Sequence, residues 1–153
     1  MTWEINIPGI FEGKTHRFTN WRLAIADMTG VPVKYVARER AVDLTLDRLV
    51  FLEAETEDPI WAPRLTPGVR RGDWDDPPDD PLWVVLLVTV PGGVLRARHL
   101  RGIAERLYEM QELMYCLDDG RWGTDDIGRR TDEFARSFEA AARRGEDLVI
   151  EGW

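Results

Sequence analysis

The chain has few of the side chains that enzymes use for nucleophilic catalysis. Its 153 residues include one cysteine, Cys116, one serine, Ser137, and two histidines, His16 and His99. A single cysteine excludes an internal disulfide and is typical of a reducing compartment, so we expect a cytoplasmic protein. Ser137 lies inside a predicted helix, not on the strained turn of a G-x-S-x-G motif. About 25 Å of predicted helix separates His99 from Cys116, so these two side chains cannot share a proton.

Metal and phosphate ligands are equally scarce. A zinc site needs three or four cysteine or histidine ligands at paired spacings, and the three such residues of this chain are scattered. Neither G-x-G-x-x-G nor the P-loop pattern occurs. We therefore predict no cofactor, no metal and no catalytic residue. The remaining enzymatic alternative is a small carboxylate-dependent enzyme that uses Asp75 or Asp76 beside glutamates.

Net charge and hydropathy exclude two classes of partner. The formal charge is -8 and the pI about 4.8, so the protein repels phosphate backbones and we expect no nucleic-acid binding. The longest apolar run, residues 82–88, is far shorter than the roughly 20 residues that span a bilayer, and no secretory signal is recognisable. We expect no membrane association and a protein partner, with a homo-oligomer left open.

The length and the order of elements predict a single α+β domain over residues 1–153. Alternating apolar residues predict a strand over residues 3–7, which forms a β-hairpin with a second strand around residues 15–18. Short helices are expected over residues 20–28 and 32–40. Residues 43–57 fit both a helical stripe and a strand, and their good helix formers favour the helix.

A connector divides the chain. Residues 58–81 hold six of the nine prolines, which excludes helix and central strand and predicts a long Pro/Asp-rich loop. The continuously apolar run at 82–90 predicts a central strand buried on both faces. With the N-terminal hairpin and a C-terminal edge strand at 148–150, it would form a small sheet packed against the helices.

Two long amphipathic helices are predicted in the C-terminal part. The first covers residues 98–117, with an apolar stripe on one side and Glu105, Glu109 and Glu112 on the other. These glutamates share one face, as an acid/base pair would, but no histidine follows at di-iron spacing, so a solvated face is favoured. The second helix follows Thr124 and ends before Gly145.

Acidic and aromatic residues are the candidate interaction groups. Long loops in small domains are often functional, and tryptophan is favoured at interfaces. The connector is either a solvated linker or an acidic docking loop with Trp74 as its aromatic anchor. The candidate residues are Trp61, Trp74, Asp73, Asp75, Asp76, Asp79, Asp80, Trp122 and Trp153.

Residues 3–60 resemble the N-terminal half of some tail assembly chaperones of actinobacterial tailed phages. The resemblance rests on a short hairpin, a helix that ends in Thr29-Gly30-Val31-Pro32, and a second helix pair that closes near Glu57-Asp58-Pro59. The excess of arginine, 18 residues against two lysines, is typical of a high-GC genome such as an actinobacterium or its phage. The resemblance implies a non-enzymatic protein that holds a tail or tape-measure subunit before assembly.

The sequence therefore predicts a non-enzymatic interaction or assembly protein, with virion assembly as its context. One alternative is a toxin-immunity or anti-defence protein whose acidic loop covers a basic active site. The carboxylate-dependent enzyme is the other. A cleft with converging carboxylates would favour the enzyme, whereas a flat apolar patch that bears tryptophan would favour binding.

Overall fold

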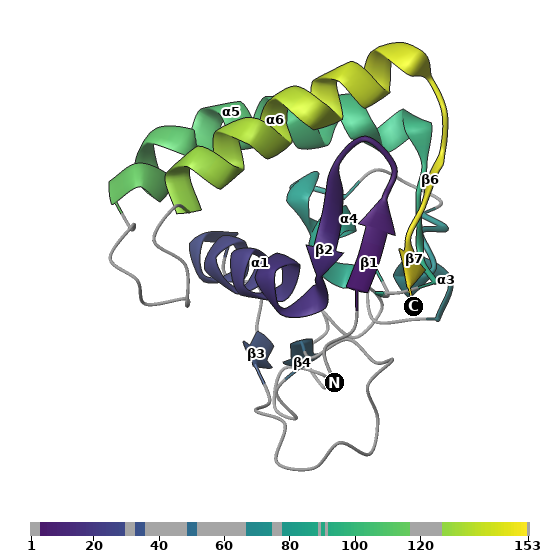
Figure 1. Cartoon of the computed structure of the whole chain (residues 1–153), viewed down its shortest axis with the longest axis horizontal. Coiled ribbons are helices and arrows are strands. Elements are labelled where there is room, and N and C mark those ends of the chain that lie inside the picture. The colour runs from purple at the N-terminus through teal and green to yellow at the C-terminus, as the bar shows by residue number, and fades with distance from the viewer. Residues whose placement is uncertain are drawn as a thin grey trace.

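The structure is a computed structural model of the chain, and it describes residues 4–29, 33–35, 49–51, 67–74, 78–88, 90, 92–116 and 127–152. Within these residues, helices combine with small antiparallel sheets of two or three strands (Figure 1), which confirms the predicted α+β class. Among the helices of these segments, none has both the length and the hydrophobicity that a bilayer crossing requires.

The predicted N-terminal hairpin is present. Strand β1 (Glu4–Ile7) pairs with β2 (Phe11–Lys14) in an antiparallel register, and a turn closes through Ile10 N–H and the Ile7 carbonyl, 2.8 Å apart. Gly9 has φ +76° in this turn, where glycine is favoured. The second strand lies earlier than predicted, because the residues expected to be extended from Thr15 onward are helical.

Helix α1 (Thr15–Thr29) is longer than the predicted helix and begins five residues before Asn20. Asn20, where the sequence predicted the helix to begin, therefore lies inside it. The early start follows from packing, since Phe18, Trp21 and Ile25 recur at helical spacing and are fully buried. His16, which lies in the segment predicted as the second hairpin strand, belongs to this helix.

A second, two-stranded sheet replaces predicted helices. Strand β3 (Val33–Tyr35) pairs antiparallel with β4 (Leu49–Phe51). The helix predicted over 32–40 is wrong at β3, and the helix favoured over 43–57 is wrong at β4, where the strand alternative holds. Valine and aromatic side chains favour strands, and the pairing between distant segments outweighs local helix propensity. The rest of both ranges lies outside the described residues.

Two short helices occur where the sequence predicted a loop and a strand. Helix α3 (Pro67–Arg70) begins with a proline, which is tolerated at a first helical position. Helix α4 (Leu82–Leu87) replaces most of the central strand predicted at 82–90. All six residues of α4 are buried, and a short apolar run buried on every side does not distinguish a strand from a helix. The chain becomes extended again at Val88.

The C-terminal segment is extended, as predicted, and pairs with two parts of the chain. Strand β6 (Leu148–Val149) pairs with β5 (Val94–Leu95), and β7 (Glu151–Gly152) pairs with β1. The three-stranded sheet therefore has the order β2-β1-β7, with β7 at its edge. Between the two pairings, Ile150 exchanges hydrogen bonds of 2.8 and 2.9 Å with the backbone of residues 92 and 93.

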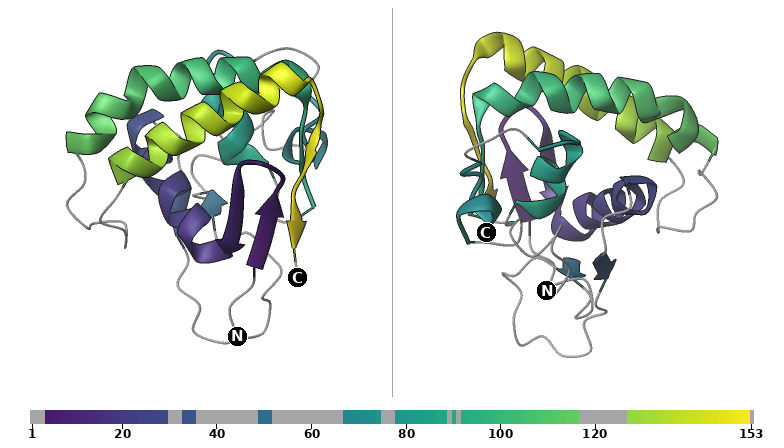
Figure 2. Two further views of the ribbon diagram at one scale, coloured as in Figure 1. Left: turned by 45° about the horizontal axis from the view of Figure 1, so that its top comes forward. Right: turned by 180° about the vertical axis from the view of Figure 1, so that it is seen from behind.

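Helices α5 (Ala97–Cys116) and α6 (Ile127–Arg144) form an antiparallel pair that lies along one side of the molecule (Figure 1). The hairpin, α1 and α4 lie on the inner side of this pair in all three views (Figure 2). The predicted apolar stripes are buried, and Gly145, with φ +68°, ends α6 as expected. The stripe residues are Leu100, Ile103, Leu107, Met110 and Met114 of α5, with Ile127, Phe134, Phe138 and Ala141 of α6.

An aromatic cluster connects α1 to α6. Phe11, Phe18, Trp21 and Phe134 lie with ring centroids 4.5 to 6.1 Å apart. The indole Nε1–H of Trp21 donates to Thr131 Oγ1 at 3.0 Å, so the polar edge of this buried ring has a partner. The cluster therefore holds the N-terminal hairpin and α1 against the inner side of α6.

A buried arginine connects α1 to α4. The Arg22 side chain is fully buried, and its Nη2 donates to the carbonyl of Leu86 and, at 3.0 Å, to the carbonyl of Val88. These carbonyls lie where α4 ends, and carbonyls at that position have no partner within the helix. The guanidinium thus caps α4 and lies 5.7 Å from the ring of Phe18.

Candidate functional site

Arginines hold the described part of the acidic connector against α5 and against the residue that precedes it. Asp73 Oδ1 accepts from Arg96 Nη2 at 2.8 Å, and Arg96 Nη1 donates to Asp147 Oδ2 at 3.1 Å. Asp147 also accepts the N–H of Ala97 at 2.8 Å, at the start of α5. This backbone hydrogen bond and the Arg96 guanidinium hold the pKa of Asp147 below its usual value. The two carboxylates in turn raise the pKa of Arg96.

Asp80 makes a second connection to α5. Its Oδ2 accepts from Arg106 Nε at 3.2 Å, and its Oδ1 accepts the N–H of Leu82 at 3.0 Å. The Asp80 side chain is only 17% exposed. This carboxylate therefore joins the start of α4 to the middle of α5, whereas Asp79 is exposed.

Trp74 is a core residue, and the hypothesis that it is an exposed aromatic anchor is wrong. Its side chain is 6% exposed, and its carbonyl accepts from Arg98 Nη2 at 2.7 Å. The backbone beside it is held against β5, because Val94 N–H donates to the carbonyl of Arg71 at 3.0 Å. With the backbone held in this way, the indole ring of Trp74 lies in the core. The other predicted interaction residues, Trp61, Asp75, Asp76, Trp122 and Trp153, lie outside the described residues.

The histidine, cysteine and serine positions that could take part in nucleophilic catalysis are as far apart as the sequence indicated. His99 lies in the first turn of α5 and Cys116 at its last residue, and Ser137 lies inside α6. His99 is buried, and its Nε2 accepts from Arg98 Nε at 3.3 Å. Burial, and then the charge of Arg98, lower the pKa of His99. The histidine is therefore held neutral at physiological pH.

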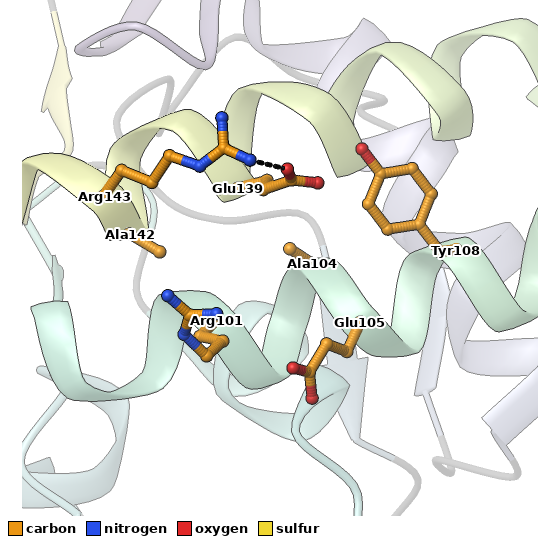
Figure 3. Close-up of a pocket in the computed structure, with 7 residues that line it drawn as sticks. All are labelled: Arg101, Ala104, Glu105, Tyr108, Glu139, Ala142 and Arg143. Atoms are coloured by element: carbon orange, nitrogen blue, oxygen red, sulfur yellow. Dashed lines mark hydrogen bonds and ion pairs between the residues drawn. The ribbon is translucent and has the colours of Figure 1, made fainter.

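A shallow groove runs between α5 and α6 on the side turned away from the core. Its volume is about 140 Å³. Two alanines, Ala104 and Ala142, lie between the helices, and charged or aromatic side chains surround them (Figure 3). These surrounding residues are Arg101, Glu105, Tyr108, Glu139 and Arg143.

Tyr108 and Glu139 connect the two helices across this groove. The nearby Glu139 carboxylate, by hydrogen bonding and by its negative charge, raises the pKa of Tyr108. Glu139 also accepts from Arg143 Nη2 at 2.5 Å, one helical turn further along α6 (Figure 3). Tyr108 is 37% exposed, so its ring remains open to a docking molecule.

The groove belongs to a larger surface with alternating charges. On α6, Arg136 pairs with Asp132 at 3.0 Å, two turns before the Glu139–Arg143 pair. Tyr108 interacts electrostatically with Asp132 and Arg136 as well as with Glu139, so these side chains face the same side as the groove.

On α5, the predicted solvated face is exposed. Glu105, Glu109 and Glu112 are all exposed, and Glu109 pairs with Arg106 at 3.2 Å, on the side toward α4. Glu105 and Glu112 instead share the stripe of Arg101 and Tyr108, because these four positions recur at helical spacing.

We call this surface the outer face. From α5 it takes Arg101, Glu105, Tyr108 and Glu112. From α6 it takes Asp132, Arg136, Glu139 and Arg143. Of these residues, only Glu105 and Glu112 are candidates from the sequence alone. The α6 residues of the outer face could have been found in the sequence from their opposite charges, which recur four residues apart.

Among the described residues, no group of three or more histidine, cysteine, aspartate or glutamate side chains is arranged to hold a metal ion. Comparison with protein-family models, with curated proteins and with solved structures gives no significant match.

Proposed function

We propose that this chain is a non-enzymatic protein-interaction or assembly protein, and that the outer face is its docking surface. The observation that carries the proposal is the arrangement of that face. The face carries charges of both signs and a partly exposed tyrosine. These side chains lie on two long helices whose apolar stripes are buried. A rigid helical support keeps these groups in place before a partner arrives, which limits the entropy lost on binding.

The chemistry of the outer face suits the recognition of a protein. Exposed ion pairs contribute little affinity, but a fixed order of charges sets the orientation of a partner and disfavours wrong ones. Tyr108 adds an amphipathic ring of the kind that is enriched at interfaces. The small side chains of Ala104 and Ala142 leave room for a partner side chain between the helices.

The acidic connector is a weaker candidate for the docking surface. Asp73 is engaged by Arg96, which precedes α5, and Asp80 by Arg106 of α5, and Trp74 is buried. Neutralisation of a basic active site by this connector would require those ion pairs to be replaced. The mixed charge of the outer face favours an assembly partner over a strongly basic toxin.

The setting that we propose is virion or tail assembly in the cytoplasm of an actinobacterial host. The hairpin and the first helix of the pattern that resembles tail assembly chaperones support this setting, as does the arginine-rich composition. The second helix pair of that pattern is not found at β3 and β4. A chaperone of this kind binds a structural subunit and releases it, so moderate affinity through a largely polar face is adequate.

Site-specific photo-crosslinking in the organism that encodes the chain tests the proposal. A benzophenone amino acid replaces Glu105 on the outer face or, as a control, Glu133 on an exposed part of α6 outside it. We expect defined protein adducts from position 105, identified by mass spectrometry, that disappear when Arg143→Glu is added. Equal adducts from both positions, or none from position 105, would contradict the proposal.

A further inference from the structure

The charges of the outer face are ordered along both helices with the same spacing. Arg101 and Glu112 lie eleven residues apart on α5, and Asp132 and Arg143 lie eleven residues apart on α6, about 16 Å in each case. Because α5 and α6 run antiparallel (Figure 1), Arg101 and Arg143 share one end of the face. Glu112 and Asp132 share the other end. The outer face is therefore positive at one end and negative at the other.

The inner positions repeat this order around the same midpoint. Glu105 and Tyr108 lie symmetrically between Arg101 and Glu112, four residues in from each. On α6, Arg136 and Glu139 lie four residues in from Asp132 and Arg143. Four pairs of positions thus lie at equal distances from the midpoint of their helix segment, and we call them symmetric pairs. Three of them combine an acidic with a basic residue, and the fourth, Glu105 with Tyr108, combines a carboxylate acceptor with a hydroxyl donor.

We propose that the outer face binds a second copy of the chain in a two-fold symmetric arrangement, with each helix antiparallel to its equivalent. A two-fold axis in the plane of the interface, perpendicular to the helices, brings each symmetric pair together between copies. Arg101 then faces the partner's Glu112, and Asp132 faces the partner's Arg143.

The same symmetry matches the inner positions. Arg136 faces the partner's Glu139, and the hydroxyl of Tyr108 faces the partner's Glu105. Rotation about an axis parallel to the helices would instead place α5 opposite the partner's α6, with Arg101 near the partner's Arg143 and Glu112 near the partner's Asp132, so like charges would meet at both ends. Charge complementarity therefore selects the antiparallel dimer.

The inference rests on the proposed function, because it names the occupant of the same docking surface.

The dimer is a weak one. Exposed ion pairs gain little on association, and Arg136 and Arg143 already have intrachain partners at 3.0 and 2.5 Å. Association should therefore be measured at protein concentrations up to roughly 1 mM, the range of weak complexes.

Sedimentation equilibrium of the full chain tests the inference. Asp132→Arg and Arg143→Glu each turn two symmetric contacts from attractive to repulsive, and we expect each to weaken dimerisation at least tenfold. The double variant D132R/R143E restores opposite charges and the original net charge, and should return to within about threefold of the wild type.

Matched controls separate this effect from a general change in charge. Glu133→Arg and Arg17→Glu carry the same changes in net charge at exposed sites outside the outer face, and they should leave dimerisation unchanged. Circular dichroism confirms that each variant keeps its helices. A monomeric wild type across the whole range, or a double variant as weak as the single ones, would overturn the inference.

The two proposals fail in different ways. If the wild type is monomeric while position 105 crosslinks to another protein, the second copy is wrong and the docking surface stands. If position 105 gives no adduct of any kind, the docking surface itself is wrong.

Discussion

Replacement of Gly72 by alanine probes how tightly the connector packs against β5. Gly72 has φ +97°, and a Cβ built on it would lie 1.8 Å from the carbonyl oxygen of Val94. An alanine at positive φ costs about 1–2 kcal/mol. Displacement of the Val94 backbone adds about 1–3 kcal/mol, as other overpacked sites do. We expect Gly72→Ala to lose about 2–5 kcal/mol, a large part of the roughly 5–15 kcal/mol that stabilises a domain.

Gly92 provides the matched control for this substitution. Its φ is +103°, close to that of Gly72, but a Cβ there would meet nothing within 4 Å. Gly92→Ala should therefore lose only the conformational part, about 1–2 kcal/mol. Urea denaturation followed by circular dichroism and tryptophan fluorescence gives both free energies of unfolding. Equal losses for the two variants would refute the close approach of the connector to β5.

Two further predictions concern buried polar groups. Arg22→Met leaves two carbonyls at the end of α4 without their charged donor and should lower the free energy of unfolding by about 2–4 kcal/mol. Arg17→Met on the exposed side of α1 should change it by less than about 0.5 kcal/mol, and similar losses in urea denaturation would contradict the capping role. Burial lowers the pKa of His99 from 6.5, so below about pH 6.5 the unfolded chain binds more protons. Wild-type stability should be complete above that pH and fall as the pH is lowered below it, more steeply than in His99→Gln; equal slopes in thermal denaturation would contradict this.

The sequence predicted those elements whose pattern is long and periodic. The stripes of α5 and α6 span about five turns each, so their apolar positions locate both helices and their buried sides. The alternation of Ile5 and Ile7 with polar residues likewise predicted β1. The end of α6 was predictable because Gly145 supplies the positive φ that often follows a helix.

The short elements could not be predicted because contacts distant in sequence determine them. The apolar run at 82–90 is buried on every side, so it carries no period, and Asp80 and Arg22 at its two ends favour α4. Strands β3 and β4 depend on a pairing between segments that are separated in the chain. Local propensity contains neither kind of information.

The candidate site was predicted only in part for the same reason. The exposed glutamates of α5 follow from its helical period, but the groove arises only when α6 lies beside α5 and Tyr108 meets Glu139. The acidic connector attracted attention as a charge cluster. Its pairing with Arg96 and Arg106 is visible only in three dimensions.

The most direct test of the self-complementary outer face is a mixing experiment. Asp132→Arg and Arg143→Glu should each be monomeric when sedimented alone, because like charges face each other in both symmetric contacts. In an equimolar mixture, each arginine of one variant faces an acid of the other, so a heterodimer should form with about the wild-type affinity. A mixture that sediments as monomers, although each variant is folded, would contradict the self-complementary outer face.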